Sequence, residues 1–298
     1  MTGSIQIGVG LPTRGRVDPE GLLRWAAAAE AGRFSSLAAT DRVVFDGLEP
    51  LVALAAAAGV THRIRLLTSV VIAPIRETTL LARQAASIDA LSGGRFSLGL
   101  GVGARQDDYL ATGASFETRG ATLDQQLPML RRIWAGEPAG EGIGPVGPHS
   151  GGRRGPELLI GGYVDAVARR IAAWGDGFMA PGGGEPSRMV ELWSAIRGAW
   201  TAAGRVGEPR WVSGSYFALG PDAETAAGSY VEAWYGRDPA RAAQRLKAIP
   251  TTPAAVTELI ERQAGMGVGE LILRPCSADL DQLERLAQLV GGEAVGGE

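Results

Sequence analysis

The stretch LSGGRFSLGLGVGA, residues 91–104, has glycines at a spacing that could hold a dinucleotide. Gly99, Gly101 and Ala104 fit the pattern G-x-G-x-x-A, in which the backbone turns closely around a pyrophosphate at the start of a helix. Because the chain has 44 glycines among 298 residues, such a match also arises by chance. The helices and strands expected around the motif must therefore show whether it binds a dinucleotide.

A dinucleotide-binding motif is followed directly by a helix and later by a strand that ends in an acid, and the residues after this motif do not predict either. We expect no periodic helix before Thr118, and no later strand ends in an acid that would bind a ribose. The other interpretation is that Gly99, Gly101 and Gly103 alternate along one strand and face one side. Missing side chains there would let a neighbouring strand or a flat ligand come close.

A glycine pair and an acid are further candidates for binding or catalysis. Gly161 and Gly162 precede a helix expected from Asp165, and backbone N–H groups at a helix start attract anions. Simple turn formation is the alternative for this pair. Asp41 ends an expected strand at 36–40, either as a functional acid or as a solvated turn or helix-capping residue.

The two histidines and the cysteine are poorly placed for catalysis. His62 lies in a turn before an expected strand, on the side opposite the strand's carboxyl end, and His149 lies in a glycine-rich segment. Cys276 follows the last expected strand with no histidine nearby, so we expect a small buried thiol. No His, Asp or Glu cluster has the spacing of metal ligands, so we expect no metal.

Short β-branched runs alternate with longer segments of helical period, which is the pattern of parallel βα units. Strands are expected at 5–11, 36–40, 64–73, 95–100, 158–161, 177–180, 211–219 and 270–274. Helices are expected at 19–31, 51–58, 80–91, 121–134, 165–174, 186–203, 222–235, 253–264 and 280–290. Eight strands alternating with helices predict an α/β fold, a (β/α)8 TIM barrel rather than an open doubly wound sheet. Pro128 predicts a kink or a late start in its helix.

Two segments depart from the regular barrel plan. Residues 136–156, GEPAGEGIGPVGPHSGGRRGP, form a Gly/Pro-rich insertion between the fourth helix and the fifth strand. We expect either a disordered surface loop or a mobile lid over the barrel mouth, where active sites of such barrels lie. The connection 236–252, with the extra helix before the last strand, is a second insertion.

The composition is that of a well-packed globular protein, with 45% apolar and 20% charged residues. A net charge of −3 gives no electrostatic case for nucleic acid or an anionic membrane surface. The single cysteine excludes an intrachain disulfide and fits a reducing compartment. No secretory leader is indicated, and the apolar run at 51–60 is too short to span a bilayer. We therefore expect a cytoplasmic protein.

The segment 68–113, TSVVIAPIRETTLLARQAASIDALSGGRFSLGLGVGARQDDYLATG, resembles the bacterial luciferase-like monooxygenase superfamily of flavin- and deazaflavin-dependent oxidoreductases. Three further segments match the usual course of this family: LLIGGY (158–163), AAWGDGF (172–178) and TTPAAVTELI (251–260). The similarity covers nearly the whole chain and is weakest over 136–156 and 205–250. It implies one luciferase-like TIM-barrel domain spanning residues 1–298.

The resemblance implies that FMN or the deazaflavin coenzyme F-420 binds at the barrel mouth. Ser69 and Val70 lie where the family has a non-prolyl cis peptide, in a bulge of the third strand that backs the central ring of the cofactor. Gly161, Gly162 and Tyr163 match the loop whose backbone N–H groups hold the cofactor phosphate.

The resemblance also assigns residues around the ring. Ala180 and Pro181 end the sixth strand beside the phosphate loop, and Gly103 faces the cofactor at the end of the fourth strand. Similar proteins place an acid at Asp41, which is thus the candidate catalytic residue and a cofactor contact. The histidine that often follows this acid is replaced by Arg42, which disfavours a histidine base and favours simple hydride transfer.

These features together predict a luciferase-like oxidoreductase or monooxygenase acting on a small organic substrate, with the chemistry supplied mainly by reduced FMN or the deazaflavin. The implied partners are the substrate, a separate reductase that supplies reduced cofactor, and a second copy in a homodimer. Two other functions stay open. A non-catalytic flavin-binding protein would bind flavin without turnover, and an NAD-dependent dehydrogenase would bind NADH and no flavin.

Overall fold

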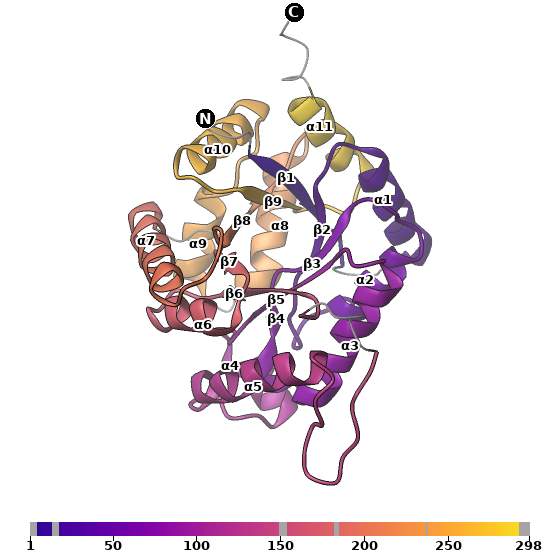
Figure 1. The fold of residues 1–298 in the computed structure, drawn as a ribbon. Coiled ribbons are helices and arrows are strands. Elements are labelled where there is room, and N and C mark those ends of the chain that lie inside the picture. Colours follow the sequence, from indigo (N-terminus) through magenta and orange to yellow (C-terminus); the bar gives the residue numbers. More distant parts are fainter. Residues whose placement is uncertain (1–4, 14–17, 149–153, 182–184, 237, 292–298) are drawn as a thin grey trace, which may run out of the picture.

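Strands and helices alternate along the chain, and the strands lie around a central axis (Figure 1). The computed structural model describes residues 5–13, 18–148, 154–181, 185–236 and 238–291. The strands are β1 (Gln6–Gly10), β2 (Ser36–Ala39), β3 (Arg65–Thr68), β4 (Val71–Ile72), β5 (Phe96–Gly101), β6 (Glu157–Gly161), β7 (Gly177–Met179), β8 (Arg210–Phe217) and β9 (Glu270–Pro275). The helices are α1 (Pro19–Ala31), α2 (Pro50–Ala58), α3 (Thr78–Leu91), α4 (Gln106–Thr112), α5 (Arg119–Trp134), α6 (Ala166–Trp174), α7 (Pro186–Ala202), α8 (Ala223–Tyr235), α9 (Pro239–Lys247), α10 (Pro253–Gly265) and α11 (Leu280–Gly291), with the 3-10 helix η1 (Ala73–Ile75).

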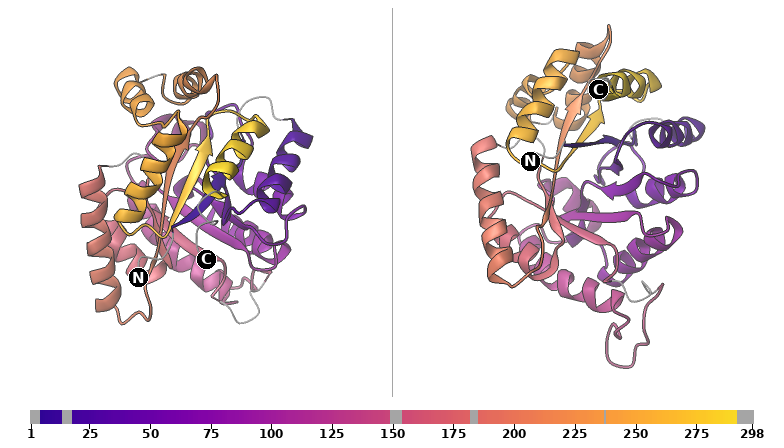
Figure 2. Two further views of the ribbon diagram at one scale, coloured as in Figure 1. Left: turned by 90° about the horizontal axis from the view of Figure 1, so that it is seen from above. Right: turned by 45° about the horizontal axis from the view of Figure 1, so that its top comes forward.

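The strands form one parallel sheet that closes on itself. Their order is β3-β2-β1-β9-β8-β7-β6-β5-β4, and the pairing of β3 with β5 completes the circle. The third barrel strand is divided into β3 and β4, so eight barrel positions hold nine strand segments. Helices surround the sheet on the outside (Figure 2). The (β/α)8 TIM barrel is confirmed, and an NAD-dependent dehydrogenase built on an open sheet is excluded.

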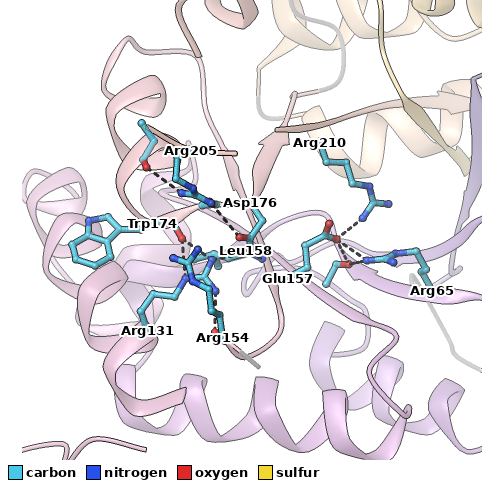
Figure 3. Close-up of polar contacts among 12 residues, drawn as sticks. Arg65, Arg131, Arg154, Glu157, Leu158, Trp174, Asp176, Arg205 and Arg210 are labelled. Atoms are coloured by element: carbon cyan, nitrogen blue, oxygen red, sulfur yellow. Dashed lines mark hydrogen bonds and ion pairs between the residues drawn. The ribbon is translucent and has the colours of Figure 1, made fainter. Parts of the chain in front are cut away.

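Charged side chains fill the barrel interior at the amino-terminal ends of the strands (Figure 3). The carboxylate of Glu157 accepts hydrogen bonds from Arg65 Nη2 at 2.8 Å, from Ser97 Oγ at 2.5 Å and from Arg210. Arg210 also pairs with Glu270, which is 1% exposed. This cluster ties the starts of β3, β5, β6, β8 and β9 together. Arg65 is partly exposed, whereas Glu270 is buried, so loss of Arg210 would leave the buried charge of Glu270 uncompensated.

An apolar layer lies above this charged layer and separates it from the barrel mouth. Its inward-facing side chains form one cluster: Ala38, Leu67, Leu159, Met179, Val212 and Ile272. Side chains two residues apart in a strand face the same side. The next inward positions on β6 and β8 are therefore Gly161 and Gly214, which leave space, while β9 presents Arg274. The barrel is consequently filled below and open at the carboxyl ends of its strands.

The glycines of the 91–104 stretch make room for the third barrel strand. A Cβ atom on Gly99 would lie 2.0 Å from the carbonyl oxygen of Thr68. The side-chain hydroxyl of Thr68 also donates a hydrogen bond to Gly99 O at 2.7 Å. A Cβ atom on Gly101 would lie 3.3 Å from Val70 Cγ2. Gly103 has a φ of 66° and faces Ile72. The prediction that these glycines allow a neighbouring strand to come close is confirmed for Gly99 and Gly101. The placement of Gly103 in the same strand is wrong, because β5 ends at Gly101 and Gly103 has a left-handed backbone.

The sequence prediction missed two helices and misplaced the start of another. Helix α4 begins at Gln106, so the expectation of no helix before Thr118 is wrong. Both helices are short, and each has few large apolar residues that would mark a helix in the sequence: Tyr109 and Leu110 in α4, and Leu246 in α9. Helix α5 runs from Arg119 through Pro128, so the late start is also wrong. The closed strand order, and not a missing helix, excludes the dinucleotide fold.

The insertion at 136–156 is anchored at the amino-terminal end of the barrel. Arg131 donates to Arg154 O at 3.0 Å and pairs with Asp176 at 2.7 Å, while Asp176 accepts from Leu158 N at 2.9 Å (Figure 3). The described part of the insertion extends from the end of α5 as a surface loop (Figure 1). A helix-to-strand connection returns to the starts of the strands, opposite the mouth, so the lid interpretation is wrong.

Within the described ranges, no helix is both long and apolar enough to cross a membrane.

Replacing Gly99 by Ala is expected to destabilise the barrel, because the added methyl group would overlap the Thr68 carbonyl oxygen. We expect a loss of about 1–3 kcal/mol in the free energy of unfolding, measured by urea denaturation. Gly198→Ala on α7 is the control, since nothing lies within 4 Å of its Cβ position. Equal stability of the two variants would contradict the close approach.

Candidate functional site

Two adjoining cavities lie at the carboxyl ends of the barrel strands. The central cavity has a volume of about 340 Å³, and the lateral cavity, below α8 and beside β1, β2 and β9, has about 350 Å³. The central cavity is lined by all nine residues that the sequence analysis assigned to the site: Asp41, Ser69, Val70, Gly103, Gly161, Gly162, Tyr163, Ala180 and Pro181. Residues distant in sequence therefore meet at one place, while their individual roles stay predictions.

The floor of the central cavity is the bulge between β3 and β4. The Ser69–Val70 peptide bond is cis, as expected. The methyl groups of Val70 lie 3.2 Å and 3.3 Å from the positions that Cβ atoms on Gly161 and Gly101 would take. Ser69 Oγ accepts a hydrogen bond from Arg274 Nη2. An apolar methyl surface with one polar edge is thus presented to the cavity.

Asp41 holds the chain in place directly after this bulge. Its Oδ2 accepts from Ile72 N at 3.0 Å and from Arg76 Nη2 at 2.9 Å, and Arg76 also pairs with Glu49 at 2.8 Å. Asp41 is 7% exposed, so the alternative of a solvated turn residue is wrong. Burial raises the pKa of Asp41 above its ordinary value, although Arg76 and the Ile72 N–H act in the opposite direction. Its part in catalysis stays a prediction.

The loop after β6 leads directly into the start of α6. Gly162 has a φ of 154°, and a Cβ atom there would lie 2.8 Å from Val167 Cγ2, so the position requires glycine. Asp165, at the helix start, makes no side-chain capping bond. Gly161, Gly162 and Tyr163 face the central cavity together with this helix start. The positive end of the helix dipole therefore favours an anion beside the loop.

An ion pair fixes the direction of α6. Arg170 Nε and Nη2 donate to the two carboxylate oxygens of Asp124 on α5 at 2.8 Å and 3.0 Å, and Nη2 also donates to Gly120 O at 3.0 Å. Mainly because of this hydrogen bond from Arg170, the pKa of Asp124 lies below its ordinary value. The pair joins the middle of α6 to the first half of α5.

Several cationic and aromatic residues of the cavity were missed by the sequence analysis. They come from the residue before α4, from β8 and β9, and from helices α8 and α9: Arg105, Tyr216, Trp234, Tyr235, Arg241, Arg245 and Arg274. Arg245 on α9 hydrogen-bonds Tyr163 of the glycine loop. Arg274 carried a usable signal, because a charged residue at the carboxyl end of a barrel strand indicates function. The α9 arginines carried none, because the helix itself was not predicted.

Arg42 lies between the two cavities. Its Nη1 donates to Trp234 O at 2.9 Å, and its guanidinium carbon lies 5.0 Å and 5.2 Å from the ring centres of Phe45 and Trp234. Asp107 is 3.8 Å away. Arg42 is thus held against α8 in the position where the resemblance places a histidine.

The remaining predicted residues lie away from the central cavity. His62 is in the exposed turn before β3, as expected, and His149 lies outside the described residues. Cys276 is buried, as expected, and lines the lateral cavity. No group of three or more potential metal ligands occurs in the described part of the chain. Neither cavity has a histidine among the described residues that line it.

Comparison with known proteins adds sequence relatives. The family model described as luciferase-like monooxygenase matches residues 4–272. Uncharacterized protein Rv0940c of Mycobacterium tuberculosis is 32% identical over 207 residues, which are 60% of this chain and 71% of the relative. The putative coenzyme F420-dependent oxidoreductase Rv3520c of the same species is 31% identical over 145 residues, 49% of this chain and 41% of that protein. The oxygenase component of flavin-dependent trigonelline monooxygenase from Acinetobacter baylyi is 31% identical over 90 residues, 30% and 25% of the two chains.

Solved structures share the fold. Monooxygenase RslO1 from Streptomyces bottropensis superposes with a TM-score of 0.80 at 24% identity, covering 98% of this chain and 99% of that one. An F420-dependent secondary alcohol dehydrogenase superposes with a TM-score of 0.77 at 17% identity, covering 97% and 99%.

Replacing Asp124 by Asn is expected to lower the melting temperature at neutral pH, because the variant loses the carboxylate that pairs with Arg170. The pKa of this Asp is depressed below its ordinary 3.8. Its stabilising contribution is therefore complete above that value and is lost as the pH falls through the lower folded-state pKa. The difference in melting temperature should accordingly shrink below about pH 3.8.

The matched control is Glu191→Gln, which removes an exposed pair with Arg188 at 3.5 Å and should have little effect. If the Asp124 variant has a lower melting temperature by the same amount at every pH, the stabilisation does not come from the charge of the Asp124 carboxylate.

Proposed function

Because the chain belongs to the luciferase-like monooxygenase family, we propose that it is an oxidoreductase that binds FMN or the deazaflavin coenzyme F-420 in the central cavity. The bound cofactor supplies hydride transfer, or oxygen activation in the case of reduced flavin, to a small organic substrate. The observation that carries this proposal is the meeting of the Ser69–Val70 bulge and the Gly161–Tyr163 loop in one cavity.

The cavity fits a flat ring with a phosphate-bearing tail. Val70 occupies the hollow left by Gly101 and Gly161 and so provides an apolar surface for a ring. Backbone N–H groups of the Gly161–Tyr163 loop and the start of α6 would hold the phosphate, and Arg241 adds positive charge from α9. Gly103, Ala180 and Pro181 would contact the cofactor from the ends of their strands.

Protein side chains would serve mainly to bind, to orient and to exclude water. Asp41 is our candidate acid beside the cofactor, and its raised pKa keeps it closer to protonation at neutral pH than an ordinary carboxyl group. Its bonds to Ile72 N and Arg76 make it a positioning residue for the bulge as well. With no histidine in the described lining, simple hydride transfer is favoured over chemistry that needs a histidine base.

Several finer features belong to the same proposal. A relative named as an oxygenase component supports a separate reductase that supplies reduced cofactor. We propose in addition that residues 1–298 form one domain, that the chain forms a homodimer and that it is cytoplasmic. The non-catalytic flavin-binding alternative predicts cofactor binding without turnover of any substrate.

Absorbance spectra test the cofactor directly. Titration of the protein into FMN and into the deazaflavin should give a saturable change in the absorption bands of one of them. A protein that changes neither spectrum would contradict the proposal.

Replacing Gly162 by Asp should abolish cofactor binding, because the side chain would collide with Val167 and place a carboxylate against the phosphate. Fluorescence or absorbance titration measures the affinity, and we expect a loss of at least about a hundredfold from removal of a charge-assisted phosphate site. Gly198→Asp, on the open surface of α7, adds the same charge and should bind normally. Retained affinity in the Gly162 variant would refute the phosphate assignment.

A further inference from the structure

The lateral cavity adjoins the central cavity. Thr40, Arg42, Trp234 and Arg274 line both spaces. Its volume of about 350 Å³ is within the range of small-molecule sites. The cofactor proposal uses only the central cavity, so the lateral one has no assigned occupant.

Neighbouring glycines make space for Arg274 at the boundary of the two cavities. Arg274 is the inward residue two positions beyond Ile272 on β9. A Cβ atom on Gly10 of β1 would lie 3.0 Å from Arg274 Cα, and one on Gly214 of β8 would lie 2.4 Å from its Nη1. Both adjacent strands therefore lack the side chains that would block a long cation lying over the apolar layer.

The charge of Arg274 is not balanced by a carboxylate. The side chain donates to Ser69 Oγ, and its guanidinium carbon lies 5.8 Å from the ring centre of Tyr216. Its Nε is buried without a hydrogen-bond partner. Among the described residues, no Asp or Glu forms an ion pair with it. Because Arg274 lines the lateral cavity and no described carboxylate balances its charge, an anion supplied by a ligand would be stabilised here.

The residues that line the lateral cavity indicate the chemistry of the rest of such a ligand. No acidic residue is found among the described residues lining it, and Arg42 is already held by Trp234 O and Asp107. Most of the wall is apolar or aromatic, including Leu11, Phe45 and Pro275. A ligand with an apolar body and one negatively charged planar group therefore matches both the walls and the arginine.

We propose that the lateral cavity binds the organic substrate as a carboxylate, with the carboxylate group on the Arg274 guanidinium and the apolar body beside Phe45 and Trp234. Calling this ligand the substrate rests on the proposed function, whereas its binding to the protein does not need the cofactor. The competing assignment gives Arg274 to the ring of the cofactor, because the same guanidinium also lines the central cavity.

Calorimetry of the cofactor-free protein tests this site with benzoate and hexanoate as probes and their neutral amides as matched ligands. We expect at least one carboxylate to bind, at least about tenfold more tightly than its amide, since the charge is the recognised feature. Arg274→Met should weaken carboxylate binding at least about tenfold and reduce the affinity for FMN or the deazaflavin by a smaller factor, because Arg274 also donates to Ser69 at the edge of the central cavity. Arg274→Lys retains the charge and should lose less.

Arg241→Met is the matched control, because this arginine lines only the central cavity and should leave carboxylate binding unchanged. Circular dichroism confirms that each variant is folded before it is titrated.

Three results would overturn the proposal: no carboxylate binds, carboxylates and amides bind equally, or the Arg274→Met variant loses cofactor and keeps the carboxylate. A protein that binds carboxylate through Arg274 but neither cofactor would refute the proposed function and leave this site standing.

Discussion

The active end of the barrel depends on space that Gly99 and Gly101 leave unfilled. Because neither has a side chain, the carbonyl of Thr68 and the methyl groups of Val70 can occupy the barrel interior beside β5. The third barrel strand is therefore divided into β3 and β4, and Asp41 fixes the second piece through Ile72 N. The glycine stretch that resembles a nucleotide loop thus shapes the floor of the cavity, while the loop suited to a phosphate lies on the next strand.

The two ends of the barrel interior have different roles: side chains at the amino-terminal ends of the strands stabilise the fold, and those at the carboxyl ends line the cavities. On β9, Glu270 and Arg274 both face inward, yet they have opposite surroundings. Glu270 lies in the charged layer and is paired with Arg210, whereas Arg274 lies above the apolar layer with no ion pair to a described carboxylate. Complete pairing at one end fits a structural role, because a buried charge is tolerated only with its partners. An unbalanced cation at the other end fits ligand binding.

The sequence predicted those features that leave a periodic or glycine pattern. Helix α1 was predicted at its observed bounds, because an apolar stripe and a proline at its start mark it. Helices α4 and α9 are short and have few large apolar residues, so they were missed. The lid interpretation failed because it ignored that helix-to-strand connections return to the amino-terminal end. The cis bond at Ser69–Val70 came from the family resemblance alone. Arg274, a charged residue at the end of a predicted strand, was not singled out from the sequence, and the barrel shows that it faces inward.

A structure of the protein with bound FMN or deazaflavin tests the central claim most directly. The account predicts cofactor phosphate oxygens at hydrogen-bonding distance, roughly 2.7–3.2 Å, from backbone nitrogens of the Gly161–Tyr163 loop, with the ring against Val70. A phosphate held instead at Gly101–Ala104, or a ring away from the bulge, would contradict it.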